Sequence, residues 1–167
     1  MHAQLTTLHV VSMILAYFAD TSVPVTRLLD ASGIRPEDLG GNDSRITPHQ
    51  ELQVCANGLA VREDLGLELG QRMHISAYGI LGYAALSSAT FGDAWQLLLE
   101  YPALLGTYFK LDLRIEGELA WVSASDYQQR PELEVFNTEM CLASLNTICT
   151  DPVSYTHLRA HETDSYL

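Results

Sequence analysis

Residues 76–95, SAYGILGYAALSSATFGDAW, decide how the rest of this chain folds. The first half of the stretch is rich in glycine, alanine and serine, with larger apolar side chains between them. Small side chains let two backbones approach closely, so we expect a helix packed deep in the domain. Gly79 and Gly82 each lower intrinsic helix stability by about 1 kcal/mol relative to alanine. Tertiary contacts must therefore hold this helix, with residues 80–86 wedged between neighbouring elements.

A second helix should begin at Thr90. Threonine is a favoured N-cap residue, and Asp93 occupies the capping-box position, where Glu or Gln is usual. Phe91 and Trp95 follow one helical turn apart and should lie on one buried stripe. Pro102 should end or kink this helix.

The residues before the central stretch indicate further helices. Residues 5–19 are apolar on nearly all sides, which is typical of a buried helix. Ser22 can cap a short second helix with Pro24 in its first turn, and Gly33 stands where a left-handed C-terminal residue belongs. We expect residues 35–46 to form a polar loop.

Two more helices follow that loop. The Thr47-Pro48 pair should start one of them. Leu65 and Leu69 are four residues apart, which places both on one face of a short helix. Gly66 and Gly70 weaken this expectation, so an irregular segment is the alternative.

After this helix, the spacing of apolar residues changes from the helical pattern to the alternation typical of a strand. Residues 109–115 alternate apolar and polar, Gly117 marks a tight turn, and residues 119–125 return as the partner strand. With a Gly117-Glu118 loop, Leu113 faces Val122; a loop shifted by one residue keeps the same faces. The apolar positions that would share the core face are Leu111, Leu113, Ile115, Ala120, Val122 and Ala124.

Pro131 should start a last helix that reaches about Thr150. The expected fold class is therefore α+β: a mostly helical N-terminal two-thirds, then an antiparallel β-hairpin and a C-terminal helix. Residues 153–163, VSYTHLRAHET, resemble one translated frame of the transposase adapter used in sequencing libraries. We expect residues 153–167 to be a non-native tail, with the natural sequence diverging near Pro152 and the domain itself incomplete.

Charge excludes one class of function. The 167 residues carry 9 Lys and Arg against 21 Asp and Glu, a formal net charge of −12. Duplex DNA is a polyanion that requires a basic protein face. We therefore expect no DNA-binding residues in this chain, and its length fits a single domain.

Cysteine usage indicates a reducing compartment. Cys55, Cys141 and Cys149 are odd in number and widely spaced, which argues against a disulfide framework or a zinc site. No apolar stretch reaches the roughly 20 residues of a membrane span. We expect a cytoplasmic protein that does not contact the membrane.

Aromatic side chains gather in and just after the central stretch. Small-molecule pockets are mostly apolar with a few placed polar groups, which tyrosine and tryptophan supply together. Plain core packing would use the same residues. The candidate ligand-binding residues are His74, Tyr78, Tyr83, Trp95 and Tyr108. Nucleotide-binding glycine motifs, serine-nucleophile motifs and metal-ligand spacings are absent, so we expect no catalytic residue, metal or cofactor.

The central stretch, preceded by LGLELG at 65–70, resembles the N-terminal effector domain of AraC-type bacterial transcription regulators with an arabinose-binding-like domain. The resemblance covers about residues 5–150 and includes LLDASGI at 28–34 and the segment 109–124. It implies that residues 1–152 sense an unknown small-molecule effector, self-associate, and control a DNA-binding helix-turn-helix domain absent from this chain. The family label does not by itself imply a sugar.

Two other functions are alternatives. A small enzyme or stand-alone binding module would place His74 in an aromatic cleft with converging polar groups. A helical dimerisation module would bind no ligand. The acidic charge, the cysteine pattern and the absent catalytic motifs favour the sensing domain over an enzyme.

Overall fold

The computed structural model describes residues 6–40, 45–101, 105, 107–117 and 119–150. Over these residues the fold is α+β, mostly helical with a hairpin before the last helix, which confirms the expected class. The elements, in chain order, are β1 (Thr6–Thr7), α1 (His9–Phe18), α2 (Val25–Leu28), η1 (Pro36–Gly40), β2 (Arg45–Ile46), α3 (Pro48–Leu59), α4 (Leu65–Gly70), η2 (Ile75–Tyr78), α5 (Gly79–Leu86), α6 (Phe91–Glu100), β3 (Lys110–Glu116), β4 (Leu119–Ser125), η3 (Pro131–Leu133) and α8 (Glu134–Thr150). The proposed tail lies outside the described residues.

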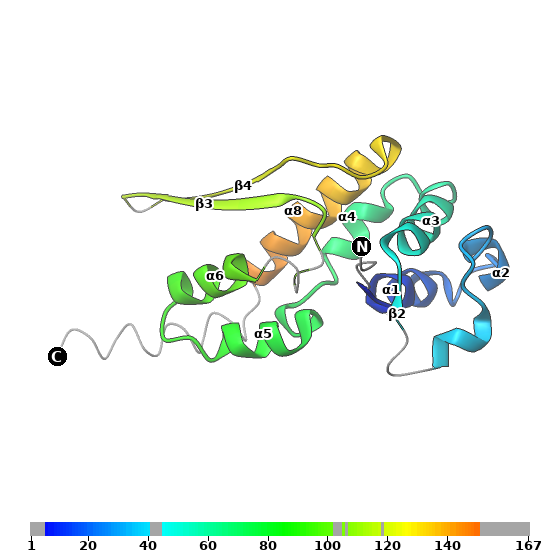
Figure 1. Cartoon of the computed structure of the whole chain (residues 1–167), viewed down its shortest axis with the longest axis horizontal. Helices are drawn as coiled ribbons and strands as arrows, with labels where there is room; N and C mark the ends of the chain where they lie inside the picture. The colour runs from blue at the N-terminus through cyan, green and yellow to red at the C-terminus, as the bar shows by residue number, and fades with distance from the viewer. Residues whose placement is uncertain (1–5, 41–44, 102–104, 106, 118, 151–167) are drawn as a thin grey trace, which may run out of the picture.

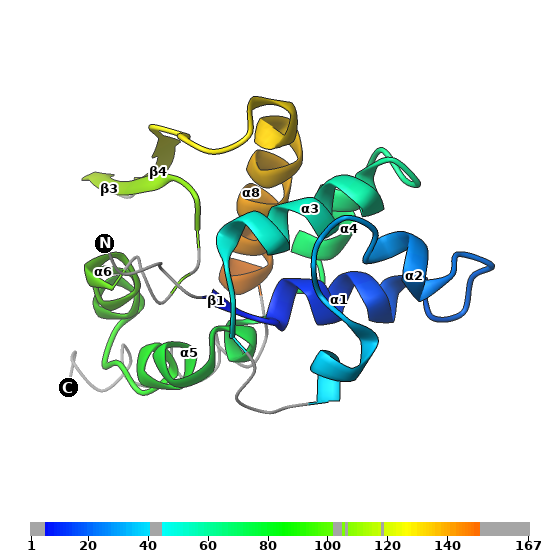
Figure 2. The same cartoon turned by 45° about the vertical axis from the view of Figure 1, so that its right-hand side comes forward.

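Two apolar clusters form the core. The first cluster joins α1, α2, α3 and α4, with Leu133 and Phe136 at the start of the last helix. The second cluster joins α5, α6 and the hairpin, with Ile148 near the end of α8. Figures 1 and 2 show α8 running from the first group of helices toward the second. The same helix therefore belongs to both clusters and connects them.

Close backbone packing attaches α4 to α8. A Cβ atom at Gly66 would overlap the carbonyl oxygen of Phe136, and one at Gly70 would lie 2.5 Å from the carbonyl oxygen of Met140. Backbone atoms cannot move aside as a flexible side chain can, so both positions require glycine. We had expected Gly66 and Gly70 to weaken this helix. The helix α4 forms despite them, and the same two glycines let it approach α8.

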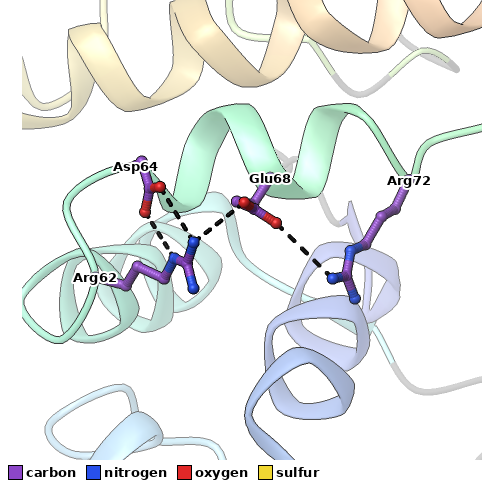
Figure 3. Close-up of polar contacts among 4 residues, drawn as sticks. All are labelled: Arg62, Asp64, Glu68 and Arg72. Atoms are coloured by element: carbon purple, nitrogen blue, oxygen red, sulfur yellow. Dashed lines mark hydrogen bonds and ion pairs between the residues drawn. The ribbon is translucent and has the colours of Figure 1, made fainter.

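An ion-pair network covers the other side of α4 (Figure 3). Arg62 Nε donates to Asp64 Oδ1 at 2.6 Å, Arg62 Nη2 lies 3.1 Å from Glu68 Oε1, and Arg72 Nη2 lies 3.8 Å from Glu68 Oε2. The two guanidinium groups also stand over the ring of Tyr17 on α1, at 5.3 and 4.8 Å from its centroid. These side chains are largely exposed, so the network orients α4 against α1 more than it stabilises the fold.

The central helix α5 is buried on one side only, so the expectation that residues 80–86 are wedged deep between neighbouring elements was wrong for its other side. Leu81 and Ala85 are buried, whereas the side chains of Ile80 and Tyr83 are 82% and 63% exposed. The small residues serve one close contact: a Cβ at Gly82 would overlap the carbonyl oxygen of Ile75 in η2. Because apolar residues occupy every side of this helix, its sequence does not reveal which side has a partner.

Most of the predicted helix starts are confirmed. The Thr90 hydroxyl accepts from the backbone N–H of Asp93 at 3.1 Å, and Thr47 forms a reciprocal capping box with Gln50. The cap at Ser22 was wrong: Pro24 precedes α2 and no side chain caps it. Gly33 has a φ of 71°, the left-handed conformation expected there.

The hairpin has the register expected for a Gly117-Glu118 loop, the first of the two alternatives, with Leu113 opposite Val122. Both of these residues are half-buried, but Ile115, nearer the turn, is 61% exposed. The shared apolar face is therefore covered at the base of the hairpin and open toward its tip. A second, very short sheet pairs β1 with β2, where we had expected only helix and loop.

We expect Gly66→Ala and Gly70→Ala each to lower the free energy of unfolding by about 1–3 kcal/mol, because the added methyl group meets backbone atoms of α8. Urea denaturation followed by circular dichroism measures the loss. Gly92→Ala in α6 is the matched control, since its Cβ would meet its nearest neighbour, Thr90 Oγ1, at 3.7 Å. That variant should be neutral or up to about 1 kcal/mol more stable. If Gly66→Ala and Gly70→Ala behaved like the control, the close contact would be refuted.

Candidate functional site

A cavity of about 790 Å³ lies between the two apolar clusters. Residues from α1, α3, α5, α6, α8 and the segment leading into β3 line it. Its size is within the range of small-molecule sites, which lie preferentially between structural units. The apolar part of the lining includes Met73, Leu81, Trp95, Leu98, Leu111 and Ile148.

A buried carboxylate lines this cavity. Glu51 lies one turn into α3 and is 3% exposed. The Tyr108 hydroxyl donates to Glu51 Oε1 at 2.7 Å. Burial, together with the negative charge of Glu51, raises the pKa of Tyr108, so its hydroxyl keeps its proton and remains a donor.

Two polar atoms of the lining are buried without a hydrogen-bond partner among the described residues: Asn137 Oδ1 and His9 Nε2. Asn137 is 2% exposed, and its amide nitrogen donates to the Tyr127 hydroxyl at 2.9 Å. Burial lowers the pKa of His9, which favours the neutral imidazole. A buried polar atom without a partner costs free energy, so both atoms are candidate contacts for a ligand.

A hydroxyl pair connects α8 with η2 at the cavity wall. The Tyr78 hydroxyl donates to Ser144 Oγ at 3.0 Å, and Ser144 Oγ donates to the carbonyl oxygen of Cys141 at 2.8 Å. Burial raises the pKa of Tyr78, so this phenol also stays protonated.

Three of the five candidate residues come together at this cavity: Tyr78, Trp95 and Tyr108. His74 and Tyr83 are not part of its described lining. His74 is exposed before η2, and Tyr83 is exposed on the uncovered side of α5. This cavity therefore does not join His74 to Tyr78, Trp95 and Tyr108.

Sequence reasoning missed Glu51, Asn137 and His9. A signal was available for Glu51, because it stands four residues before the buried Cys55 and so shares the inward side of α3. Asn137 likewise follows the buried Phe136 and lies two turns before the buried Ser144 on α8. A polar residue at a buried helical position was the pattern to look for.

The cysteines are free in the structure. Burial raises the pKa of the Cys141 thiol to about 11, and burial and Glu51 raise that of Cys55. Both thiols are therefore protonated near neutral pH. Within the described part of the chain, no three His, Cys, Asp or Glu side chains are grouped to hold a metal ion. Nor does any helix there have the length and apolar character needed to cross a bilayer.

The sequence is similar to proteins of a known family. The family model for the N-terminal arabinose-binding domain of AraC transcription regulators matches residues 23–162. The ornithine utilization regulator of Pseudomonas aeruginosa is 37% identical over 132 residues, 78% of this chain and 39% of that protein. Uncharacterised HTH-type transcriptional regulators of Mycobacterium bovis and Mycobacterium tuberculosis are each 25% identical over 97 residues, 56% of this chain and 28% of theirs. No solved structure matches this chain significantly.

We expect Tyr108→Phe to lower the free energy of unfolding by about 1–3 kcal/mol, because a buried carboxylate oxygen loses a hydrogen-bond donor. Tyr83→Phe is the control, since that exposed side chain should tolerate the change within about 0.5 kcal/mol. Chemical denaturation of both variants gives the comparison. Equal stability of the two would show that the Glu51–Tyr108 bond does not contribute as described.

Proposed function

Because this chain belongs to the family of N-terminal arabinose-binding domains of AraC transcription regulators, we propose that it binds a small-molecule effector and thereby controls the DNA binding of a regulator. The observation that carries the proposal is the cavity of about 790 Å³ between the two apolar clusters. It combines an apolar wall with a few buried polar groups, which is the composition of a small-molecule site.

The position of the cavity between the two clusters suggests how ligand binding could change the arrangement of the domain. A ligand in the cavity touches residues of both clusters, and so favours the arrangement in which both contact it. An effector can shift an equilibrium only through its different affinity for the two arrangements.

The name of the Pseudomonas aeruginosa relative provides a first compound to test. That protein is a regulator of ornithine utilization, so ornithine and related amino acids belong at the head of an effector screen. The family description mentions arabinose, so arabinose is the sugar to test beside these amino acids in the same screen.

DNA binding is proposed for another part of the regulator. The net charge of −12 makes these 167 residues a poor partner for a polyanion. The chain spans 39% of the length of its Pseudomonas relative and 28% of that of each mycobacterial relative. The mycobacterial proteins are named helix-turn-helix regulators, and we propose such a domain as the DNA reader. A cytoplasmic location and a non-catalytic role are part of the same proposal.

Self-association is proposed through the hairpin. Leu119 and Trp121 on β4 are 61% and 53% exposed, and β3 pairs only with β4 among the described strands. An open strand edge beside exposed apolar side chains can pair with the same edge of a second copy, related by two-fold symmetry.

The effector proposal is tested by thermal shift and calorimetry with an amino-acid, amine and sugar panel. A compound that binds only the folded state raises the melting temperature, by an amount that grows with its concentration. We expect Tyr78→Phe to weaken binding of such a compound, because Tyr78 lines the cavity. Tyr83→Phe should leave affinity unchanged, because Tyr83 lies outside it. Affinity that depended on Tyr83 and not on Tyr78 would place the site elsewhere.

Sedimentation velocity tests the association proposal. We expect the wild-type sedimentation coefficient to rise with concentration, and Trp121→Ser to shift the dimer dissociation constant upward by about tenfold or more. Ser123→Thr, on the same face of β4, is the control and should associate like the wild type. A wild-type protein that sediments as a monomer at every concentration would contradict the proposal.

A further inference from the structure

We infer that β3 is a self-recognition edge, which pairs antiparallel with β3 of a second copy in the register that sets Asp112 opposite Arg114. The inference rests on the self-association proposed above and adds the strand, the register and the residues that select the partner. It follows from the open edge of β3, from the order of charges along this strand, and from the hollow beside it.

One edge of β3 has no strand partner in the described part of the chain. β3 pairs with β4 from Lys110 opposite Ser125 to Glu116 opposite Leu119, and with no other described strand. Figure 1 shows both strands extending past the end of α6. Because Glu116 and Leu119 flank a two-residue loop, they form a hydrogen-bonded pair of the ladder. Such pairs alternate along the strand, so the backbone groups of residues 111, 113 and 115 point toward the open edge.

Charges alternate in sign along the exposed face of β3. In chain order they are Lys110, Asp112, Arg114 and Glu116. A two-fold axis at Leu113 reverses this order in the second copy, which sets Lys110 opposite Glu116 and Asp112 opposite Arg114. Each charged side chain of the strand then faces an opposite charge. Arg114 Nε already lies 3.4 Å from Glu116 Oε1 of its own strand, but both side chains are largely exposed, so this contact holds Arg114 only weakly.

No neighbouring register matches all of these charges. An axis at Leu111 or at Ile115 keeps the same backbone groups at the seam, but it leaves two of the four charges of the strand without an opposite charge. An axis at Asp112 or Arg114 sets like charges opposite each other. Opposite charges across a seam stabilise a strand pair, and like charges destabilise it. The charge order therefore selects the register centred on Leu113.

The apolar face fits the same register. Leu113 lies opposite its own copy, and Leu111 lies opposite Ile115, which is 61% exposed in a single copy. A hollow of about 530 Å³ lies between α6 and β3. Residues 111–113 and 115 line it together with Gln96, Leu99 and Glu100, and its described lining includes no residue of β4. The hollow gives the apolar side chains of a second β3 strand room beside α6.

The ion pairs act on the choice of partner more than on the strength of binding. Each copy carries a net charge of −12, so long-range repulsion opposes association. Backbone hydrogen bonds and the burial of the apolar face must overcome this repulsion. Complementary charges at an interface mainly fix register and exclude wrong partners. We therefore assign Asp112 and Arg114 the role of selecting a second copy of the same strand.

Charge reversal tests this assignment by sedimentation velocity on the whole chain. Asp112→Arg and Arg114→Asp each set like charges opposite each other at both symmetric positions, so each should raise the dimer dissociation constant at least about tenfold. An equal mixture of the two variants should associate again, because two arginines of one chain then face two aspartates of the other. A general loss of stability would not be rescued by mixing. Glu63→Arg, exposed between α3 and α4, is the matched control and should associate like the wild type.

A cross-link tests the register and does not depend on the charge variants folding. Leu113→Cys should form a disulfide-linked dimer on oxidation, because hydrogen-bonded antiparallel neighbours have Cα atoms about 5.5 Å apart, within disulfide range. Ile115→Cys is the control, since residue 115 would lie about 14 Å from its own copy. The wild type, treated in the same way, accounts for the native cysteines.

The outcomes separate this inference from the proposed self-association. Circular dichroism checks that each variant folds. Charge variants that associate like the wild type, a mixture no better than its components, or equal cross-linking at positions 113 and 115 would overturn the β3 pairing. If Trp121→Ser still weakened the dimer, self-association through the hairpin would stand. A wild type that stays monomeric at every concentration would overturn both.

Discussion

The contact between α4 and α8 is the constraint on which the rest of the structure depends. Gly66 and Gly70 bring the backbone of a six-residue helix against carbonyl groups of a seventeen-residue one. Through this contact the first apolar cluster packs against α8, whose C-terminal part also belongs to the second cluster. The cavity lies between these clusters and is lined along α8 by Asn137, Ser144 and Ile148. The packing of the two helices thus sets where the α8 part of the lining lies.

Burying the polar side chains of Glu51 and Asn137 in the cavity lining lowers the stability of the fold, a loss that an apolar core would avoid. Glu51 and Asn137 occupy inward positions of their helices, where leucine or methionine would bury apolar area without any desolvation of polar atoms. Tyr108 and Tyr127 offset part of that cost through hydrogen bonds. Asn137 Oδ1 has no partner among the described residues, and a buried acceptor of this kind calls for an explanation such as a bound molecule or water.

Local signals in the sequence predicted most helices and the hairpin, but they did not predict which elements pack against one another. Thr90 and Thr47 identify helix starts because a cap involves only a few neighbouring residues, and alternation predicted which hairpin residues share a face. The exposed side of α5 could not be foreseen, because apolar residues surround that helix and only the position of its neighbours decides which are buried. Of the five candidate residues, Tyr78, Trp95 and Tyr108 line the cavity, whereas the carboxylate and the amide were not among the candidates. Their role depends on bringing α3, α8 and the start of β3 together.

The glycine contact also extends along most of α8. Gly66 lies against Phe136, Gly70 lies against Met140, Ala143 and Ser144, and Thr147 Oγ1 lies 3.3 Å from the carbonyl oxygen of Gly70. The part of α8 that carries Ser144 and Ile148 into the cavity wall is therefore attached to α4 and not only to its neighbours in the second cluster. A side chain added at either glycine would displace the cavity wall as well as the core.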